Sequence, residues 1–212
     1  MAVSYDYIRQ PAEIYRRSFA IVREEAGLDR LPAEADMEAV ATRLIHACGM
    51  VDVVDDLAFS NTAVAAGKGA LQSGAPVYCD VEMVRSGIIA SRLPADNSLI
   101  CTLNDPAVPN HAGDIDNTRS AAAVDFWQEI DGAVVAIGNA PTALFRLLEI
   151  IDRTDARPAL VIGLPVGFVG AAESKEALAE FGRGLDFITV QGRRGGSAMA
   201  SAVVNALAAG LD

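Results

Sequence analysis

The chain has 212 residues, of which 51% are hydrophobic, 6% aromatic and 21% charged, a composition that excludes a disordered or fibrous protein. A formal net charge of −11, from 17 Lys and Arg against 28 Asp and Glu, argues against a nucleic-acid partner and against an anionic membrane surface. The length and the lack of an internal linker predict a single domain over residues 1–212.

Short apolar runs alternate with longer amphipathic segments, which is typical of a mostly parallel sheet covered by helices. In chain order, the predicted helices are Glu13–Glu25, Ala33–Cys48, Asn61–Gln72, Thr118–Ile130, Pro141–Asp152, Ser174–Phe181 and Ser197–Ala209. The predicted strands are Val77–Asp80, Leu99–Leu103, Ala133–Ile137, Ala159–Gly163 and Phe187–Val190. The pattern predicts a three-layer α/β/α fold in which the loops after the strands surround one ligand crevice.

The cysteines and histidines do not predict a metal site. Cys48, Cys79 and Cys101 lie far apart and have neither a disulfide framework nor a ligand spacing, and His46 and His111 are equally scattered. His111 lies in the polar segment PNHAGD and is predicted to be exposed to solvent. The chain start lacks the pattern of a signal peptide, and no uncharged stretch is long enough to span a bilayer, so we expect a cytoplasmic protein.

His46 is the main candidate for proton chemistry. It lies in the predicted helix Ala33–Cys48, roughly opposite an apolar stripe that should face the core. The residues beside it on that small, uncharged face are Ala35, Ala39, Thr42 and Met50. We expect substrate or a second subunit to cover this face. Two interpretations of His46 stay open, a structural or surface histidine and an acid–base group.

Two glycine-rich turns after predicted strands suit an anionic ligand. The segment GLPVGFVGAAESK contains Gly167 and Gly170, and QGRRGGSAM places Arg193 and Arg194 at the start of a helix. The first turn departs from the GxGxxG pattern, so it gives little support to a dinucleotide cofactor. For the second turn, a solvated loop is the alternative to a ligand site.

Several polar residues are candidate ligand contacts for which the alternative interpretation is a helix cap or a solvated side chain. They are Ser18, Arg85, Ser86, Asn117, Thr118 and Asn139. Arg119 is different, because an arginine at the start of a helix lies at its electrostatically unfavourable end. The chain has neither GxSxG nor a P-loop, so proton-assisted chemistry on a polyanionic ligand is the class of mechanism that remains.

The segments RLIHACG, NTRSAAA, GNAPTALFRLLE, GLPVGFVGAAESKEAL and GRRGGSAM resemble the precorrin-8X methylmutase family of cobalamin biosynthesis. The resemblance runs from YDYIRQPAEIYRRSFAIVR to the last helix. It implies a flavodoxin-like homodimer with substrate sites near the subunit interface. It also implies an isomerase that needs no cofactor and moves a methyl group from C-11 to C-12 of precorrin-8X, giving hydrogenobyrinate.

The same resemblance assigns roles to residues. His46 is the implied acid–base group, and Arg17, Ser18, Arg43 and Arg119 are implied substrate contacts. The complete set of candidate substrate-binding residues is Arg17, Ser18, Arg43, Arg85, Ser86, Arg119, Asn139, Gly167, Gly170, Arg193 and Arg194. Two alternatives stay open, a cobalt-containing substrate and a corrinoid carrier without turnover. The segment IIASRLPADN favours the metal-free substrate.

Overall fold

A computed structural model describes residues 4–32, 36–181 and 184–211. Its central element is a six-stranded sheet in the order β1-β6-β5-β4-β2-β3. The strands are β1 Leu57–Phe59, β2 Val77–Cys79, β3 Leu99–Ile100, β4 Val134–Ile137, β5 Leu160–Gly163 and β6 Phe187–Val190. β1 pairs antiparallel with β6 and the remaining pairs are parallel, which confirms the predicted, mostly parallel sheet.

Helices connect the strands. They are α1 Pro11–Ala26, α2 Glu38–Cys48, α3 Ala63–Gln72, α4 Glu82–Gly87, α5 Val108–Asp114, α6 Arg119–Val124, α7 Pro141–Thr154, α8 Ala171–Glu180 and α9 Ser197–Ala209, with short 3-10 helices η1 Leu28–Arg30, η3 Val51–Asp56 and η4 Ala90–Arg92. The sequence did not predict β1, α4 or α5. The predicted helix Thr118–Ile130 is too long, because α6 ends at Val124. The predicted start at Ala33 lies outside the described residues.

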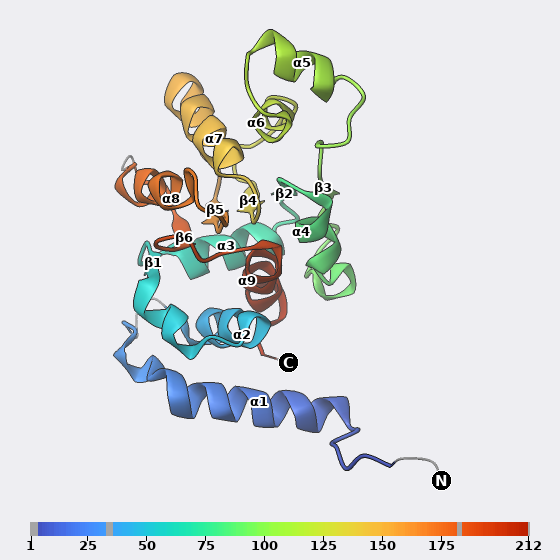
Figure 1. The fold of residues 1–212 in the computed structure, drawn as a ribbon, viewed down its shortest axis with the longest axis vertical. Helices are drawn as coiled ribbons and strands as arrows, with labels where there is room; N and C mark the ends of the chain where they lie inside the picture. Colours follow the sequence, from blue (N-terminus) through green and yellow to red (C-terminus); the bar gives the residue numbers. More distant parts are fainter. Residues whose placement is uncertain (1–3, 33–35, 182–183, 212) are drawn as a thin grey trace.

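Alternating residues of the strands fill two separate cores, which produces the three predicted layers. Val134 and Ala136 of β4 belong to the core under α9, whereas Val135 and Ile137 belong to the core under α7. Figure 1 shows α6, α7 and α8 on one side of the sheet and α3 and α9 on the other. No helix of the described residues is both long and apolar enough to cross a membrane.

The parallel strands follow the order β3-β2-β4-β5-β6, which is the flavodoxin-like arrangement. The chain direction across the sheet reverses between β2 and β4, and Asp80 lies at this point, directly after β2. Its carboxylate accepts hydrogen bonds from the amides of Gly138, Asn139 and Ala140, each 2.9 Å long. Burial raises the pKa of Asp80, and the amide hydrogen bonds oppose that rise. Asp80 therefore ties together the ends of the two strands.

Helix α2 has two covered faces, because it lies between α9 and the outermost helix α1 (Figure 1). The six consecutive residues from Val40 to Ile45 are buried. The prediction that substrate or a second subunit covers the face beside His46 is wrong for Thr42, which is fully buried within this chain. Ala39 and Met50 are half-buried, and Ala35 lies outside the described residues.

Candidate active site

His46 lies on the last turn of α2 and faces α1. The hydroxyl Oγ of Ser18 on α1 is 2.7 Å from Nδ1 of His46. The rings of Tyr15 and Phe19 lie 5.5 and 5.3 Å from the imidazole, the latter edge-on. His46 itself remains exposed. Two helices that are distant from the sheet therefore orient an imidazole that solvent and ligands can reach.

Hollows open on both sides of His46. A cleft of about 400 Å³ runs between α2, α4 and α9, and its lining includes Tyr15, Met83, Ser201 and Asn205. A second hollow, of about 530 Å³, lies between α1 and the end of α2. The predicted contacts Arg17 and Ser18 line the second hollow together with His46.

Arg43 lies one turn before His46 and lines the same cleft. Its side chain is largely buried, its Nε donates to the carbonyl of Gly210, and its guanidinium lies 5.7 Å from the Phe19 ring centre. On its other side, Arg43 lines a hollow of about 510 Å³ to which Arg16, Arg23 and Arg92 also contribute. Arg43 thus connects the His46 cleft with a hollow that three further arginines line.

Arg16 and Arg17 share one acidic partner, Glu13, at 2.7 and 2.6 Å. Hydrogen bonds from these two guanidinium groups lower the pKa of Glu13 to about 2. Glu13 therefore stays ionised and holds Arg17 at the edge of the hollow beside Ser18.

The two glycine-rich turns lie together in space. Gly167, Arg193 and Arg194 line a fourth hollow, of about 330 Å³, next to Met50. Gly167 and Gly170 have backbone φ angles of 142° and 77°, which favour glycine. Met50 comes just after α2, so this hollow adjoins the end of the helix that carries His46.

The remaining predicted residues are not brought into the His46 cleft. Arg119 lies in a shallow hollow of about 460 Å³ and donates to the Leu103 carbonyl at 3.3 Å. Arg85 pairs with Glu82 at 3.0 Å, and Ser86 is exposed next to Gly87, which does line the cleft. The exposed residue Asn139 follows β4, and its backbone amide binds Asp80.

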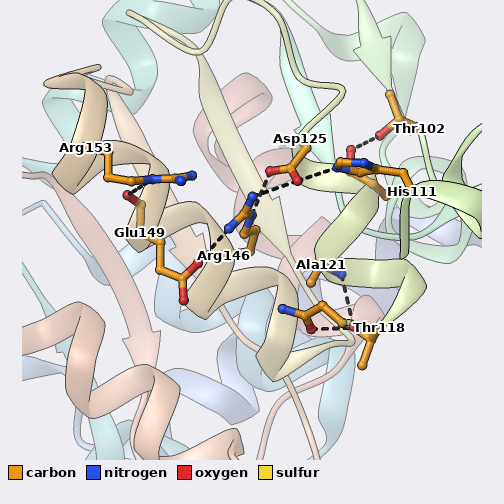
Figure 2. A network of polar contacts seen from close by, with 10 residues as sticks. Thr102, His111, Thr118, Ala121, Asp125, Arg146, Glu149 and Arg153 are labelled. Atoms are coloured by element: carbon orange, nitrogen blue, oxygen red, sulfur yellow. Dashed lines mark hydrogen bonds and ion pairs between the residues drawn. The ribbon is translucent and has the colours of Figure 1, made fainter. Parts of the chain in front are cut away.

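The prediction that His111 is a solvated loop residue is wrong. His111 lies in α5, is half-buried, and its Nε2 is 2.7 Å from Oδ2 of Asp125. Figure 2 shows Arg146 contacting the same carboxylate from α7, at 2.7 and 2.8 Å. Burial raises the pKa of Asp125, but the hydrogen bonds from Arg146 and His111 outweigh this effect and lower it. Figure 2 also shows Thr118 capping α6 through the amide of Ala121.

Sequence reasoning missed the residues that α4 and α9 contribute to the cleft. Asn205 lies in an almost wholly buried helix, where its amide oxygen accepts from the Ile89 amide at 2.8 Å and its nitrogen donates to the Gly87 carbonyl at 3.0 Å. A polar residue within an apolar helix was the available signal. No group of three or more potential metal ligands occurs among residues 4–32, 36–181 and 184–211.

The sheet order and the exposed histidine beside arginine-lined hollows define a flavodoxin-like α/β protein with a candidate acid–base site for an anionic ligand. Residues 13–209 match the family model described as precorrin-8X methylmutase. The chain belongs to the precorrin-8X methylmutase family, and it is an isomerase of cobalamin biosynthesis.

Relatives of the chain support this assignment over nearly its full length. It is 60% identical to a precorrin-8X methylmutase of Pseudomonas aeruginosa, with 96% of this chain and 97% of the relative covered. A cobalt-precorrin-8 methylmutase of Priestia megaterium is 38% identical, with 93% and 87% covered. The crystal structure of a precorrin-8X methylmutase from Thermus thermophilus superposes with a TM-score of 0.82 at 39% identity, covering 92% of this chain and 94% of that one.

Proposed function

We propose that this chain converts precorrin-8X into hydrogenobyrinate, with His46 as the acid–base group. The observation that carries the proposal is the contact of Ser18 Oγ with Nδ1 of an exposed His46 at the edge of an open cleft. In the reaction, the bond from the methyl group to C-11 breaks and a bond to C-12 forms, so the substrate and product are isomers. The methyl shift gains from holding the ring in one reactive tautomer, and proton transfer by His46 selects that tautomer.

Ser18 determines which ring nitrogen of His46 serves this purpose. With Nδ1 held by the Ser18 hydroxyl, Nε2 is the nitrogen left to exchange a proton with the ligand, and it acts as an acid in the imidazolium form, in which Nδ1–H donates to Ser18 Oγ. The rings of Tyr15 and Phe19 restrict rotation of the imidazole. Proton transfer then occurs at a fixed position on the bound ring.

The arginines around the cleft suit a macrocycle that carries many carboxylates. Arg43 faces the cleft from the same helix as His46, and Arg17 lies beside Ser18. Ion pairs between guanidinium and carboxylate groups fix orientation as well as affinity. We propose the more distant candidates, Arg119 and Arg193, as contacts for the ring periphery.

Replacement of Ser18 by alanine should lower kcat about tenfold and change KM little. The imidazole of His46 remains but loses the hydroxyl contact that orients it. Steady-state kinetics with precorrin-8X measure this effect. Ser73→Ala, which removes the hydroxyl of an exposed residue just after α3 and outside the lining of the cleft, serves as the matched control. A Ser18→Ala variant with raised KM and unchanged kcat would show that Ser18 binds substrate rather than orienting His46.

We propose the metal-free substrate. The relatives from Pseudomonas aeruginosa and Sinorhizobium, both called precorrin-8X methylmutases, are 60% and 54% identical to this chain. Six relatives called cobalt-precorrin-8 methylmutases are 34–40% identical to it. The test mixes purified protein with precorrin-8X, without cofactor, and follows the visible spectrum. Conversion supports the proposal, whereas stable stoichiometric binding indicates a carrier or an enzyme for the cobalt-containing substrate.

We also propose a homodimer in which a second copy covers α1. The outermost helix exposes Ile14, Tyr15 and Ile21, with 44%, 43% and 51% of each residue accessible. Tyr5 and Tyr7, just before it, are exposed as well. Apolar patches of this kind mark protein interfaces.

The proposed homodimer predicts that charged substitutions on the exposed face of α1 dissociate the two subunits. Light scattering during gel filtration should give twice the chain mass, and the double variant Ile14→Glu, Ile21→Glu should elute as a monomer. Glu24→Gln, an exposed change on the same helix, should remain a dimer. A wild-type monomer at micromolar concentration would contradict the proposal.

A further inference from the structure

Lys175 of α8 is a buried cation for which the reaction described above has no role. None of its surface is exposed to solvent. Its ammonium donates to the carbonyl of Gly192 at 2.9 Å and to the carbonyl of Arg194. Burial lowers the pKa of Lys175 to about 8, and the nearby Asp56 opposes this shift. A cation at a position where burial disfavours its charge indicates a specific role for that residue.

Lys175 holds the second glycine-rich turn, and backbone hydrogen bonds join that turn to the first. The carbonyl of Arg193, between the two that Lys175 holds, accepts from the Gly167 amide at 3.3 Å. The amide of Gly196 donates to the Leu164 carbonyl at 2.8 Å. Three consecutive carbonyls, those of residues 192–194, therefore each accept a hydrogen bond, two from Lys175 and one from the Gly167 amide.

The same turn is connected to the segment that follows α2. The guanidinium of Arg194 pairs with Asp52 at 2.7 Å and with Asp56, both in η3. These ion pairs occupy the Arg194 side chain, so it orients the turn relative to the His46 helix. Arg193 remains exposed and lies with its guanidinium 5.4 Å from the centre of the Phe168 ring.

Phe168 and Arg193 together form an exposed surface that combines an apolar ring with a cation. Phe168 is 84% exposed on the first glycine-rich turn. A macrocycle with an apolar face and peripheral carboxylates offers the complementary combination. The hollow beside these two residues also includes Met50, just beyond the end of the His46 helix.

We propose that Lys175 is a positioning residue, and that it holds the 192–194 turn so that Phe168 and Arg193 contact the corrinoid. This inference rests on the proposed function and adds a second contact surface to it. Lys175 itself touches no ligand. It contributes affinity by fixing the surface before binding occurs, which lowers the entropic cost of association.

The test compares Lys175→Met with Lys68→Met, which removes an exposed lysine paired with Asp36 at 2.6 Å. For each protein, titration gives the Kd of hydrogenobyrinate and kinetics give KM and kcat for precorrin-8X. We expect Lys175→Met to raise Kd and KM about tenfold and to leave kcat within about twofold. Lys68→Met should match the wild type.

Each outcome bears on the inference. A Lys175→Met protein that melts at a lower temperature but keeps the wild-type Kd has lost only stability, and the inference is then wrong. If Lys175→Met does not fold, a change of the exposed residue Phe168 provides the test. An unchanged Kd for Phe168→Ala overturns the inference, and a raised Kd supports it. A wild-type protein that neither binds hydrogenobyrinate nor converts precorrin-8X overturns the proposed function and this inference together.

Discussion

Replacement of His46 by asparagine should lower kcat for precorrin-8X by roughly 10²–10⁴-fold, the usual contribution of a general acid or base. Asparagine retains a polar side chain that can still bind Ser18, but it cannot transfer a proton near neutral pH. The affinity for product should change by less than about threefold, because the arginines that we propose as carboxylate contacts are untouched. Single-turnover absorption spectra and product titration measure the two quantities separately.

The second histidine provides the control for this experiment. His111→Asn removes the ring that contacts Asp125 on α6's carboxyl-terminal side, away from the His46 cleft. We expect this variant to keep its kcat. A His46→Asn enzyme with wild-type kcat would exclude the acid–base role, and one that binds product but does not turn over, beside a wild type that does, would support it.

Replacement of Asp80 by alanine should lower the free energy of unfolding by about 3 kcal/mol or more. The change leaves the amides of Gly138, Asn139 and Ala140 without their acceptor at a buried position. Urea denaturation followed by circular dichroism measures the loss. Asp80→Asn should also lower the free energy of unfolding. It replaces one carboxylate oxygen by an NH2 group, which cannot accept a hydrogen bond from the backbone amides.

A matched control for Asp80 is Asp105, which is exposed and accepts one backbone hydrogen bond, from Ala107 at 2.8 Å. Asp105→Ala should change the free energy of unfolding by less than about 1 kcal/mol, because water replaces the lost hydrogen bond at this exposed position. Equal effects at the two positions would show that Asp80 does not hold the strand ends together.

Elements with strong local signals were predictable from the sequence. The strand Phe187–Val190 and the helix Ser197–Ala209 match β6 and α9 at both ends. β1 was missed because three residues at a sheet edge carry almost no periodicity. α4 and α5 were missed because helices of six and seven residues depend on tertiary packing rather than on their own propensity.

The candidate site was predictable only in part. Sequence alone singled out His46 and included Ser18 among the polar candidates. The family resemblance made Ser18 a substrate contact, and the structure places its hydroxyl against His46. The burial of Thr42 was not predictable, because the periodicity of one helix does not show that α2 has neighbours on both faces. The ion pairs of Arg194 join residues more than a hundred positions apart, and no local pattern reports such contacts.

The position of α1 has a consequence for the dynamics of the site. This helix is the outermost element, packed on α2 and η3, yet it supplies Ser18 to His46. Elements with few buried contacts open locally at a lower free energy than the core does. Undocking of α1 would separate the serine from the imidazole while the sheet stays folded. The proposed partner subunit covers α1 and would keep it docked, so amide exchange in α1 should be faster in the Ile14→Glu, Ile21→Glu monomer than in the dimer.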